Sequence, residues 1–200
     1  MKPRVLGTRY DRIADWWHRH HQDSQYGVAQ VRRALQFCKP GGSALDVGCG
    51  AGGRIVRLLQ QHQLAVTGID VSVEMIKLAI ENHPQEVFAV EDICQYSSAE
   101  HYDFIVAWDS IFHLPLKEQE PVIGKLCALL KPGGVLIYTC GDAVGEHQDT
   151  WHGQTFHYSS IGITGNLSLL ARHGVVCKHL ELDQWPQNHV TVIGLKETEQ

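Results

Sequence analysis

The stretch that decides the fold is LDVGCGAGG, residues 45–53, which lies between a predicted strand at 44–47 and a predicted helix at 54–62. Three of its glycines match the pattern GxGxxG: Gly48, Gly50 and Gly53. Glycines at such a junction let the backbone turn tightly and approach a ligand closely. Asp70 ends the next predicted strand, 20 residues after Gly50, where a carboxylate can accept hydrogen bonds from ribose hydroxyls. Taken alone, the stretch predicts a nucleotide site, and it also fits a nicotinamide dinucleotide site or a glycine turn without a ligand.

Outward from this loop, short β-rich runs alternate with helical patterns. We expect strands at 44–47, 65–69, 86–90, 102–108 and 135–139, and helices at 54–62, 72–82, 117–130 and 161–173. Such alternation predicts a parallel sheet with helices on both faces. The last two strands, 175–182 and 190–195, are joined by a stretch too short for a helical crossover, so they should be antiparallel. The expected fold is α/β: a doubly wound, mostly parallel, seven-stranded Rossmann-like sheet with a final antiparallel strand.

Two segments stand apart from this alternation. Residues 1–40 precede the first strand and carry apolar residues at helical spacing, so they predict an N-terminal helical cap. The positions that show this spacing are Tyr10, Ile13, Ala14 and Trp17. The polar stretch 141–159 is long for a connection in a compact domain and predicts a substrate-side loop insertion. We expect residues 1–200 to form a single domain.

Composition narrows the classes of function. The 200 residues carry a net charge of −5, with 44% hydrophobic and 20% charged residues, which is typical of a soluble globular protein. No stripe of Lys or Arg is visible, so no tight binding to nucleic acid is expected. No apolar run approaches the roughly 20 residues of a membrane span, and the N-terminus lacks the apolar core of a signal peptide. The six scattered cysteines form no CxxC pair, which predicts reduced thiols in a cytoplasmic protein.

Five motifs, in order along the chain, resemble those of class I S-adenosylmethionine-dependent methyltransferases. ALDVGCGAG at 44–52 looks like the first motif of that family, and GIDVSVEM at 68–75 looks like the second. EDI at 91–93 resembles the acidic motif that contacts adenine. YDFIV at 102–106 is similar to the fourth-strand motif, and LLKPGGVL at 129–136 to the turn into the fifth strand. The resemblance implies a transferase that uses S-adenosylmethionine and leaves S-adenosylhomocysteine as product.

The resemblance also implies a set of cofactor-binding residues. They are Tyr10, Asp46, Gly48, Cys49, Gly50, Asp70, Val71, Met75, Asp92, Ile93, Trp108 and Asp109. Asp70 should bind the two ribose hydroxyls, because the two oxygens of one carboxylate suit a diol. Asp92 should accept from the adenine amino group or simply form a turn, and Met75 should pack on the ring or in the core. Tyr10 and Trp16 should cover the cofactor or pack on the sheet.

Candidates for a general base lie in the segments that the expected fold places beside the substrate. Methyl transfer is an in-line displacement at a carbon that the sulfonium activates, so the protein supplies positioning and, for some acceptors, a base. His113 follows the fourth strand, and Glu146 and His157 lie in the polar stretch. Each also fits a structural role, as a packed or capping histidine or as part of a surface loop. No Cys/His spacing matches a structural zinc site, so no metal is expected.

The substrate can be narrowed to a class. DSIF at 109–112 differs from the (Asn/Asp)-Pro-Pro-(Tyr/Phe) motif of family members that methylate exocyclic amines in nucleic acids. Aromatic and polar residues interleaved in 141–159 favour a small-molecule pocket. We therefore expect a small-molecule methyltransferase, a monomer or homodimer, whose acceptor atom stays open. A non-catalytic protein that binds the cofactor or a partner on the same fold is the alternative, and an NAD-dependent oxidoreductase is a weaker one.

Overall fold

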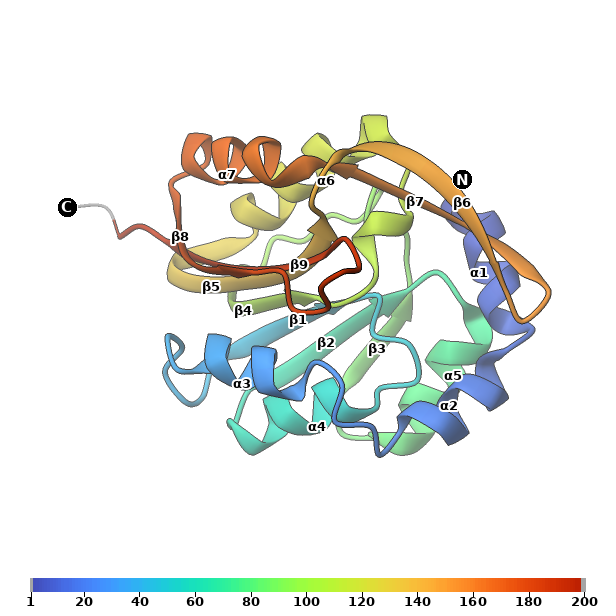
Figure 1. Cartoon of the computed structure of the whole chain (residues 1–200). Helices are drawn as coiled ribbons and strands as arrows, with labels where there is room; N and C mark the ends of the chain where they lie inside the picture. Colours follow the sequence, from blue (N-terminus) through green and yellow to red (C-terminus); the bar gives the residue numbers. More distant parts are fainter. Residues whose placement is uncertain (1, 199–200) are drawn as a thin grey trace.

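The computed structural model describes residues 2–198 and confirms the expected α/β fold. A seven-stranded sheet has the order β3-β2-β1-β4-β5-β9-β8 (Figure 1). Its strands are β1 (Ser43–Val47), β2 (Ala65–Asp70), β3 (Val87–Val90), β4 (Tyr102–Ala107), β5 (Leu130–Gly141), β8 (Val175–Glu181) and β9 (His189–Lys196). The pairs among β1 to β5 are parallel, and β9 runs antiparallel to both β5 and β8. The antiparallel strand at the end of the chain is the one that the sequence predicts.

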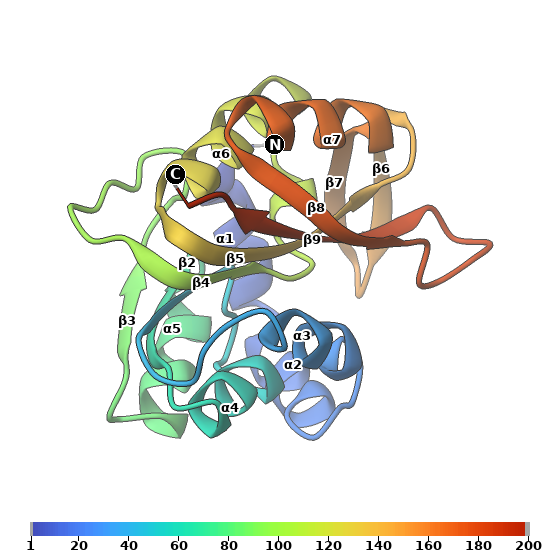
Figure 2. The ribbon, with the colours of Figure 1, turned by 90° about the vertical axis from the view of Figure 1, so that its left-hand side faces the viewer.

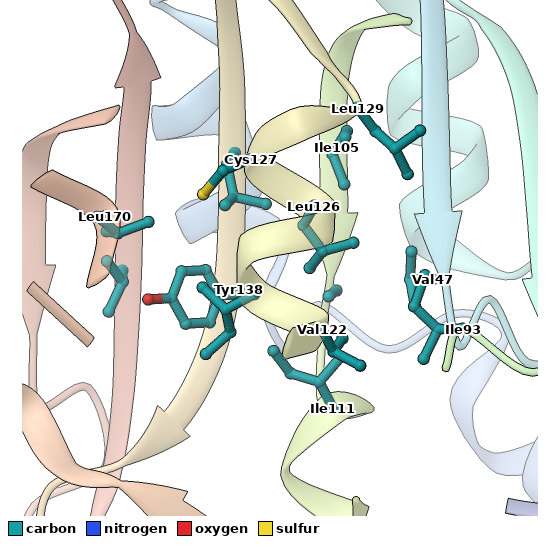
Figure 3. Close-up of a cluster of buried hydrophobic side chains, with 14 of the residues drawn as sticks. Val47, Ile93, Ile105, Ile111, Val122, Leu126, Cys127, Leu129, Tyr138 and Leu170 are labelled. Carbon is teal, nitrogen blue, oxygen red and sulfur yellow. The ribbon is translucent and has the colours of Figure 1, made fainter. Parts of the chain in front are cut away.

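Helices cover both faces of this sheet (Figure 2). They are α1 (Pro3–Asp11), α2 (Ala14–His21), α3 (Val28–Leu35), α4 (Arg54–Gln61), α5 (Val73–Asn82), α6 (Leu116–Ala128), α7 (Gly162–Arg172) and the short 3-10 helix η1 (Ile111–His113). Apolar side chains of α6 and α7 pack on one face, and those of α3 and α4 pack on the other. Figure 3 shows the first of these clusters, where Leu126 of α6 and Leu170 of α7 lie around Tyr138 of β5.

The central strand β4 shows why the sequences of these strands are unbroken apolar runs. Phe104 and Val106 belong to the cluster of α3 and α4, whereas Ile105 and Ala107 belong to that of α6 and α7. All four side chains are fully buried. A strand with helices on both faces has no polar side, so its pattern is a continuous hydrophobic run. Polar residues are therefore left for the ends of the strands, where the chain leaves the core.

The fifth strand starts earlier than its sequence predicts. The stretch KPGG, residues 131–134, was expected as a turn, but β5 begins at Leu130 and includes it. The pairing with β4 shifts between Tyr102 and Phe104, and Gly133 has a φ of +76°. A glycine in this conformation lets the strand bulge and continue, so the turn residues stay within the strand.

The N-terminal cap consists of three helices, and the helical spacing that runs through residues 10–17 is interrupted. The first helix ends at Asp11, and α2 begins at Ala14. Asp11 Oδ1 accepts from Ser72 Oγ at 2.6 Å and from the N–H of Glu74 at 3.1 Å. These groups lie at the N-terminus of α5, where a carboxylate satisfies free N–H groups and interacts favourably with the helix dipole. The break thus lets the cap dock on α5.

Residues 141–159 form a hairpin and not the predicted loop. They contain β6 (Val144–Trp151) and most of β7 (Gln154–Ile161), which pair in register as a separate two-stranded antiparallel sheet. His152 and Gly153 make the turn with φ values of +48° and +68°, as two-residue hairpin turns require. The strand β6 is exposed along nearly its whole length, so it lacks the apolar alternation that identifies a half-buried strand. In Figure 1 the hairpin extends from the sheet toward α1.

Two expectations from composition can be compared with the structure. Within residues 2–198, no helix is long and apolar enough to cross a membrane. All six cysteines lie in this part of the chain and are free thiols. Cys38, Cys127 and Cys140 are buried, and the other three are half-buried.

The docking of α1 can be tested through Gly7. A Cβ added to Gly7 would lie 2.2 Å from the carbonyl oxygen of Val71, which belongs to the backbone. Gly7→Ala should therefore lower the free energy of unfolding by about 1–3 kcal/mol, the usual cost of overpacking, although Ala favours helices. Urea unfolding followed by circular dichroism measures the change. Thr8→Ala, on the exposed side of the same helix, is the matched control, and an equal effect of both variants would contradict docking through Gly7.

Candidate functional site

A pocket lies at the carboxyl ends of β1, β2 and β4, beside residues of α1 and α2. Its empty volume is about 1250 Å³, counting the part that is open to solvent. All twelve residues of the cofactor set inferred from the motifs line it: Tyr10, Asp46, Gly48, Cys49, Gly50, Asp70, Val71, Met75, Asp92, Ile93, Trp108 and Asp109. The fold thus brings residues from position 10 to position 109 around one hollow.

Asp70, at the end of β2, holds the glycine loop in place. Its Oδ2 accepts from the N–H of Gly50 at 3.0 Å, and its Oδ1 accepts from the N–H of Ser72 at 2.8 Å. Gly50 has a φ of +53°, which is unfavourable for other residues. Burial raises the pKa of Asp70, and the backbone hydrogen bonds oppose this shift. Because a carboxylate oxygen can accept two hydrogen bonds, each oxygen of Asp70 retains capacity for a ligand.

Asp46 is a second buried carboxyl group, near the end of β1. Its side chain is almost completely buried. Burial, followed by the charge of Asp70, raises the pKa of Asp46 to about 7, while Arg54 acts in the opposite direction. A cation or a hydrogen-bond donor in the pocket would favour the charged forms of both acids.

Arg54 also lines the pocket, and the motifs did not point to it. It is the first residue of α4, and its guanidinium lies 5.4 Å from the centre of the Tyr26 ring while its Nε donates to the Tyr26 carbonyl. Burial lowers the pKa of Arg54, and the charges of Asp109 and Asp46 oppose this. A guanidinium here can bind a carboxylate. A basic residue in the first turn of a helix opposes the helix dipole, and this unusual position was the signal available in the sequence.

The loop after β3 is held by a lysine from α6. Lys125 Nζ donates to the carbonyls of Ile93, Cys94 and Tyr96 at 2.8, 2.9 and 2.9 Å. Asp92 Oδ1 accepts from the N–H of Cys94 at 2.8 Å. This is the hydrogen bond of a turn-forming Asp, one of the two roles expected for Asp92. Asp92 and Ile93 both line the pocket, so Lys125 fixes the shape of one of its walls. The helical pattern around Lys125 gave no sign of this contact.

The aromatic cover of the pocket differs from the expected one. Trp17 of α2 lines the pocket, whereas Trp16 packs against Trp151 at the tip of the hairpin with ring centres 5.1 Å apart. The break between α1 and α2 sets which side of α2 faces inward. A Cβ on Gly50 would lie 3.8 Å from Trp17 Nε1 and 3.9 Å from Met75 Sδ, so these two side chains stand over the glycine loop.

His113 lines the pocket and is almost completely buried. Its Nδ1 lies 2.8 Å from the carbonyl oxygen of His157. A carbonyl only accepts, so Nδ1 carries the proton and Nε2 accepts from the Tyr10 hydroxyl at 3.0 Å. Burial lowers the pKa of His113 to about 4. The ring is therefore neutral at pH 7, and its lone pair is already engaged by Tyr10.

Glu146 and His157 lie on the hairpin, and neither is among the described residues that line the pocket. Glu146 Oε1 accepts from the N–H of Leu116 at 2.8 Å and from His157 Nε2 at 3.2 Å. The hydrogen bond from Leu116 lowers the pKa of Glu146. The pair joins the hairpin to the start of α6, so both side chains have a structural contact. Only the backbone carbonyl of His157 reaches a ring nitrogen of His113.

Comparisons with known proteins agree with this geometry. The profile of the methyltransferase domain family matches residues 18–163. The chain is similar to phosphoethanolamine N-methyltransferase 2 of Caenorhabditis elegans, with 32% identity over 126 residues, 60% of this chain and 28% of that protein. It is also similar to a ubiquinone biosynthesis O-methyltransferase of Coxiella burnetii, with 29% identity over 138 residues, 64% of this chain and 58% of that protein. The matches thus span less than two thirds of these relatives.

Solved structures share the fold over nearly the whole chain. A magnesium protoporphyrin IX methyltransferase from Synechocystis PCC 6803, solved with bound S-adenosylmethionine, has a TM-score of 0.74 over 98% of both chains at 18% identity. A sugar N-methyltransferase from Streptoalloteichus has a TM-score of 0.71 over 92% of both chains at 16% identity. At these identities the likeness shows the fold, which agrees with the strand order described above.

The raised pKa of Asp46 predicts how stability depends on pH. In the unfolded chain this carboxyl loses its proton near its ordinary pKa of 3.8, whereas in the folded chain it keeps the proton to about pH 7. Its contribution to stability is therefore full below about pH 4 and is lost as the pH rises through about 7. Asp46→Asn has no proton to lose here. Between about pH 4 and 8, its free energy of unfolding should therefore rise relative to that of wild type by at least about 1.4 kcal/mol, the equivalent of one pKa unit. Urea unfolding of the ligand-free protein measures it.

Asp103 is the matched control for this experiment. Burial would raise the pKa of Asp103, but the bonds from Lys131 and Ser43 outweigh it and the pKa is lowered. Lys131 Nζ lies 2.6 Å from Asp103 Oδ2. Asp103→Asn should therefore destabilise the protein most at neutral pH, the opposite direction to Asp46→Asn. If the difference in free energy of unfolding between Asp46→Asn and wild type does not change with pH, the pKa of Asp46 is not raised in the folded protein.

Proposed function

The chain belongs to the methyltransferase domain family, and we propose that it binds S-adenosylmethionine and transfers the methyl group to a small-molecule acceptor. Asp70 carries this proposal, because both oxygens of a buried, fixed carboxylate can accept one more hydrogen bond from the pocket. The two hydroxyls of a ribose supply two such donors. The names of the relatives support methyl transfer to small molecules. We propose that residues 1–200 form one catalytic domain.

The pocket residues fit the two ends of this cofactor. Asp92 and Ile93, on the loop that Lys125 holds, suit the adenine edge, and Met75 suits its face. At the other end, the guanidinium of Arg54 suits the methionine carboxylate, and Asp109 suits the ammonium. When bound, the cofactor supplies a methyl group on a positively charged sulfur. The protein is then required to place the acceptor and to exclude water.

A row of aromatic rings in contact extends from His113, in the pocket wall, to the hairpin. Tyr158 of β7 lies with its ring centre 5.6 Å from Phe112 and 4.9 Å from His113. On its other side it stacks on the exposed His147, 5.1 Å away. The row ends at the surface of the hairpin, and an aromatic surface of this kind favours a flat or cationic small molecule as the acceptor.

Tyr10 and His113 form a polar pair at the pocket end of this row. With a pKa of about 4, His113 is too weak a base to take a proton efficiently at pH 7. It instead accepts from the Tyr10 hydroxyl at 3.0 Å, which leaves the oxygen of Tyr10 to accept from an O–H or N–H group of the acceptor. We propose that the pair orients an amine or hydroxyl acceptor for in-line attack.

Calorimetric titration with S-adenosylmethionine tests the cofactor. Wild type should bind it, and Asp70→Ala should bind it about ten- to a hundredfold more weakly, because a buried charged hydrogen bond contributes about 1.5–3 kcal/mol. Asp15→Ala, which removes an exposed carboxylate on α2, should bind as wild type does. NAD is the control ligand. Binding of NAD alone would favour an oxidoreductase, and binding of neither ligand would favour a partner-binding protein.

The Tyr10–His113 pair is tested once an acceptor is found by screening amines, phenols and thiols with a methyl-tritiated donor. With the best acceptor, Tyr10→Phe should lower kcat about tenfold, the effect of one hydrogen bond. The dissociation constant of S-adenosylmethionine should change by less than about twofold. His113→Gln should act similarly, and the double variant should lose no more than either, since the residues act as a unit. Additive losses would show that the two residues act independently.

A further inference from the structure

His189, the first residue of β9, lies between two carboxylates. Its Nδ1 is 2.6 Å from Asp183 Oδ1, and its Nε2 is 2.9 Å from Asp109 Oδ1. The side chain of His189 is 14% exposed, that of Asp183 is 3% exposed and that of Asp109 is 25% exposed. Asp109 lines the pocket, whereas His189 and Asp183 are not among the described lining residues. The two thus support a pocket carboxylate from behind.

The charged and titratable groups that face His189 come from several parts of the chain. Besides the two carboxylates, Tyr26 places its hydroxyl 3.4 Å from Nε2. Burial and Asp109 raise the pKa of Tyr26, so this group stays neutral. Arg54 contributes a positive charge that acts on Asp109. Two rings without charge also flank the imidazole: Trp108 and Phe112.

The two carboxylates determine the protonation state of His189. Both partners of the ring are carboxylate oxygens, which only accept, so His189 must donate from both nitrogens and is an imidazolium. Burial alone would lower the pKa of His189, but the bonds to Asp109 and Asp183 outweigh it and the pKa is raised. A neutral ring could donate to one carboxylate only. Asp183 is the more buried and has the shorter contact, so it would keep the N–H, and Asp109 would face a lone pair.

The backbone of Asp109 and one oxygen of its carboxylate are both held in place. Asp109 follows β4 with a φ of +50°, in the left-handed region that few non-glycine residues adopt. Its N–H donates to Thr139 Oγ1 at 2.9 Å, and Thr139 Oγ1 donates back to Asp109 Oδ1 at 3.2 Å. His189 and Thr139 together therefore hold one carboxylate oxygen, which fixes the direction of the other.

We propose that His189 is a positioning residue whose bridge from Asp183 to Asp109 orients the Asp109 carboxylate for the ammonium at the methionine end of the cofactor. The proposal rests on the proposed function, since it needs that cofactor. Affinity for ligands with the ammonium should fall when His189 loses its proton, because Asp109 then loses its fixed direction. Ligands without the amino-acid end should not be affected.

The experiment measures two ligands by calorimetry between about pH 6 and 9. S-adenosylhomocysteine carries the ammonium, and 5′-methylthioadenosine lacks it. In wild type, the affinity for S-adenosylhomocysteine should fall about tenfold more toward alkaline pH than that for 5′-methylthioadenosine, the loss expected for a charge-assisted hydrogen bond. The ligand's own ammonium titrates alike in every variant, so the difference between variants is the quantity that decides.

Three variants separate this role from a structural one. His189→Gln keeps an N–H for Asp109 without a titrating proton, so most of the alkaline loss should disappear. Asp183→Asn still accepts from Nδ1 but no longer stabilises the imidazolium, so the loss should move to lower pH. His179→Gln is the matched control, because His179 also lies 3.0 Å from a carboxylate, that of Glu181 on β8, and does not line the pocket. It should behave as wild type does.

The outcomes distinguish failure of the inference from failure of the proposed function. An NMR titration of the His189 ring in the ligand-free protein should give a midpoint above the ordinary value in wild type and a lower one in Asp183→Asn. The inference is overturned if His189→Gln, shown to be folded by its circular dichroism, keeps the full alkaline loss, or if 5′-methylthioadenosine loses affinity in parallel. Binding of neither nucleoside by wild type would overturn the proposed function, while the NMR titration would still report the bridge.

Discussion

The Asp70 carboxylate joins the two turns on which the pocket depends. One oxygen holds the glycine loop through Gly50, and the other holds the start of α5 through Ser72. The hydroxyl of Ser72 in turn binds Asp11, through which the N-terminal cap docks. A single buried acid thus connects β2, the glycine loop and the cap, so a residue that would recognise a ligand also holds the turns around the pocket in place.

The sheet could be predicted from the sequence because its strands are buried on both faces. Continuous apolar runs such as residues 104–107 have no other stable place in a fold of this length, and the glycine loop fixes where the first strand ends. The hairpin of β6 and β7 could not be predicted, since β6 is exposed on both sides and its residues carry no periodic signal. The cap was recognised as helical, but its break at residues 12–13 arises from a tertiary contact of Asp11.

The site was predictable where a motif fixes the backbone and not where long side chains reach across space. Asp46, Asp70 and Asp92 lie at or near the carboxyl ends of β1, β2 and β3, so the topology alone brings them together. Arg54 and Lys125 reach the site from helices, and His189 supports it from the far end of the chain. The roles of these three side chains are established by their contacts. His113 was found by position, but its tautomer and its bond to Tyr10 depend on the hairpin, which supplies the carbonyl of His157.

The helix α6 serves two regions at once. Its apolar side fills the core shown in Figure 3, with Val122, Leu126 and Cys127 all buried. Its Lys125 holds three carbonyls of the loop beside the pocket. Core packing and ligand affinity are therefore thermodynamically linked: a substitution that loosens α6 weakens binding at a distance, and a bound ligand returns the same free energy to the core. Selection for a stable interior and selection for a tight site act on the same helix.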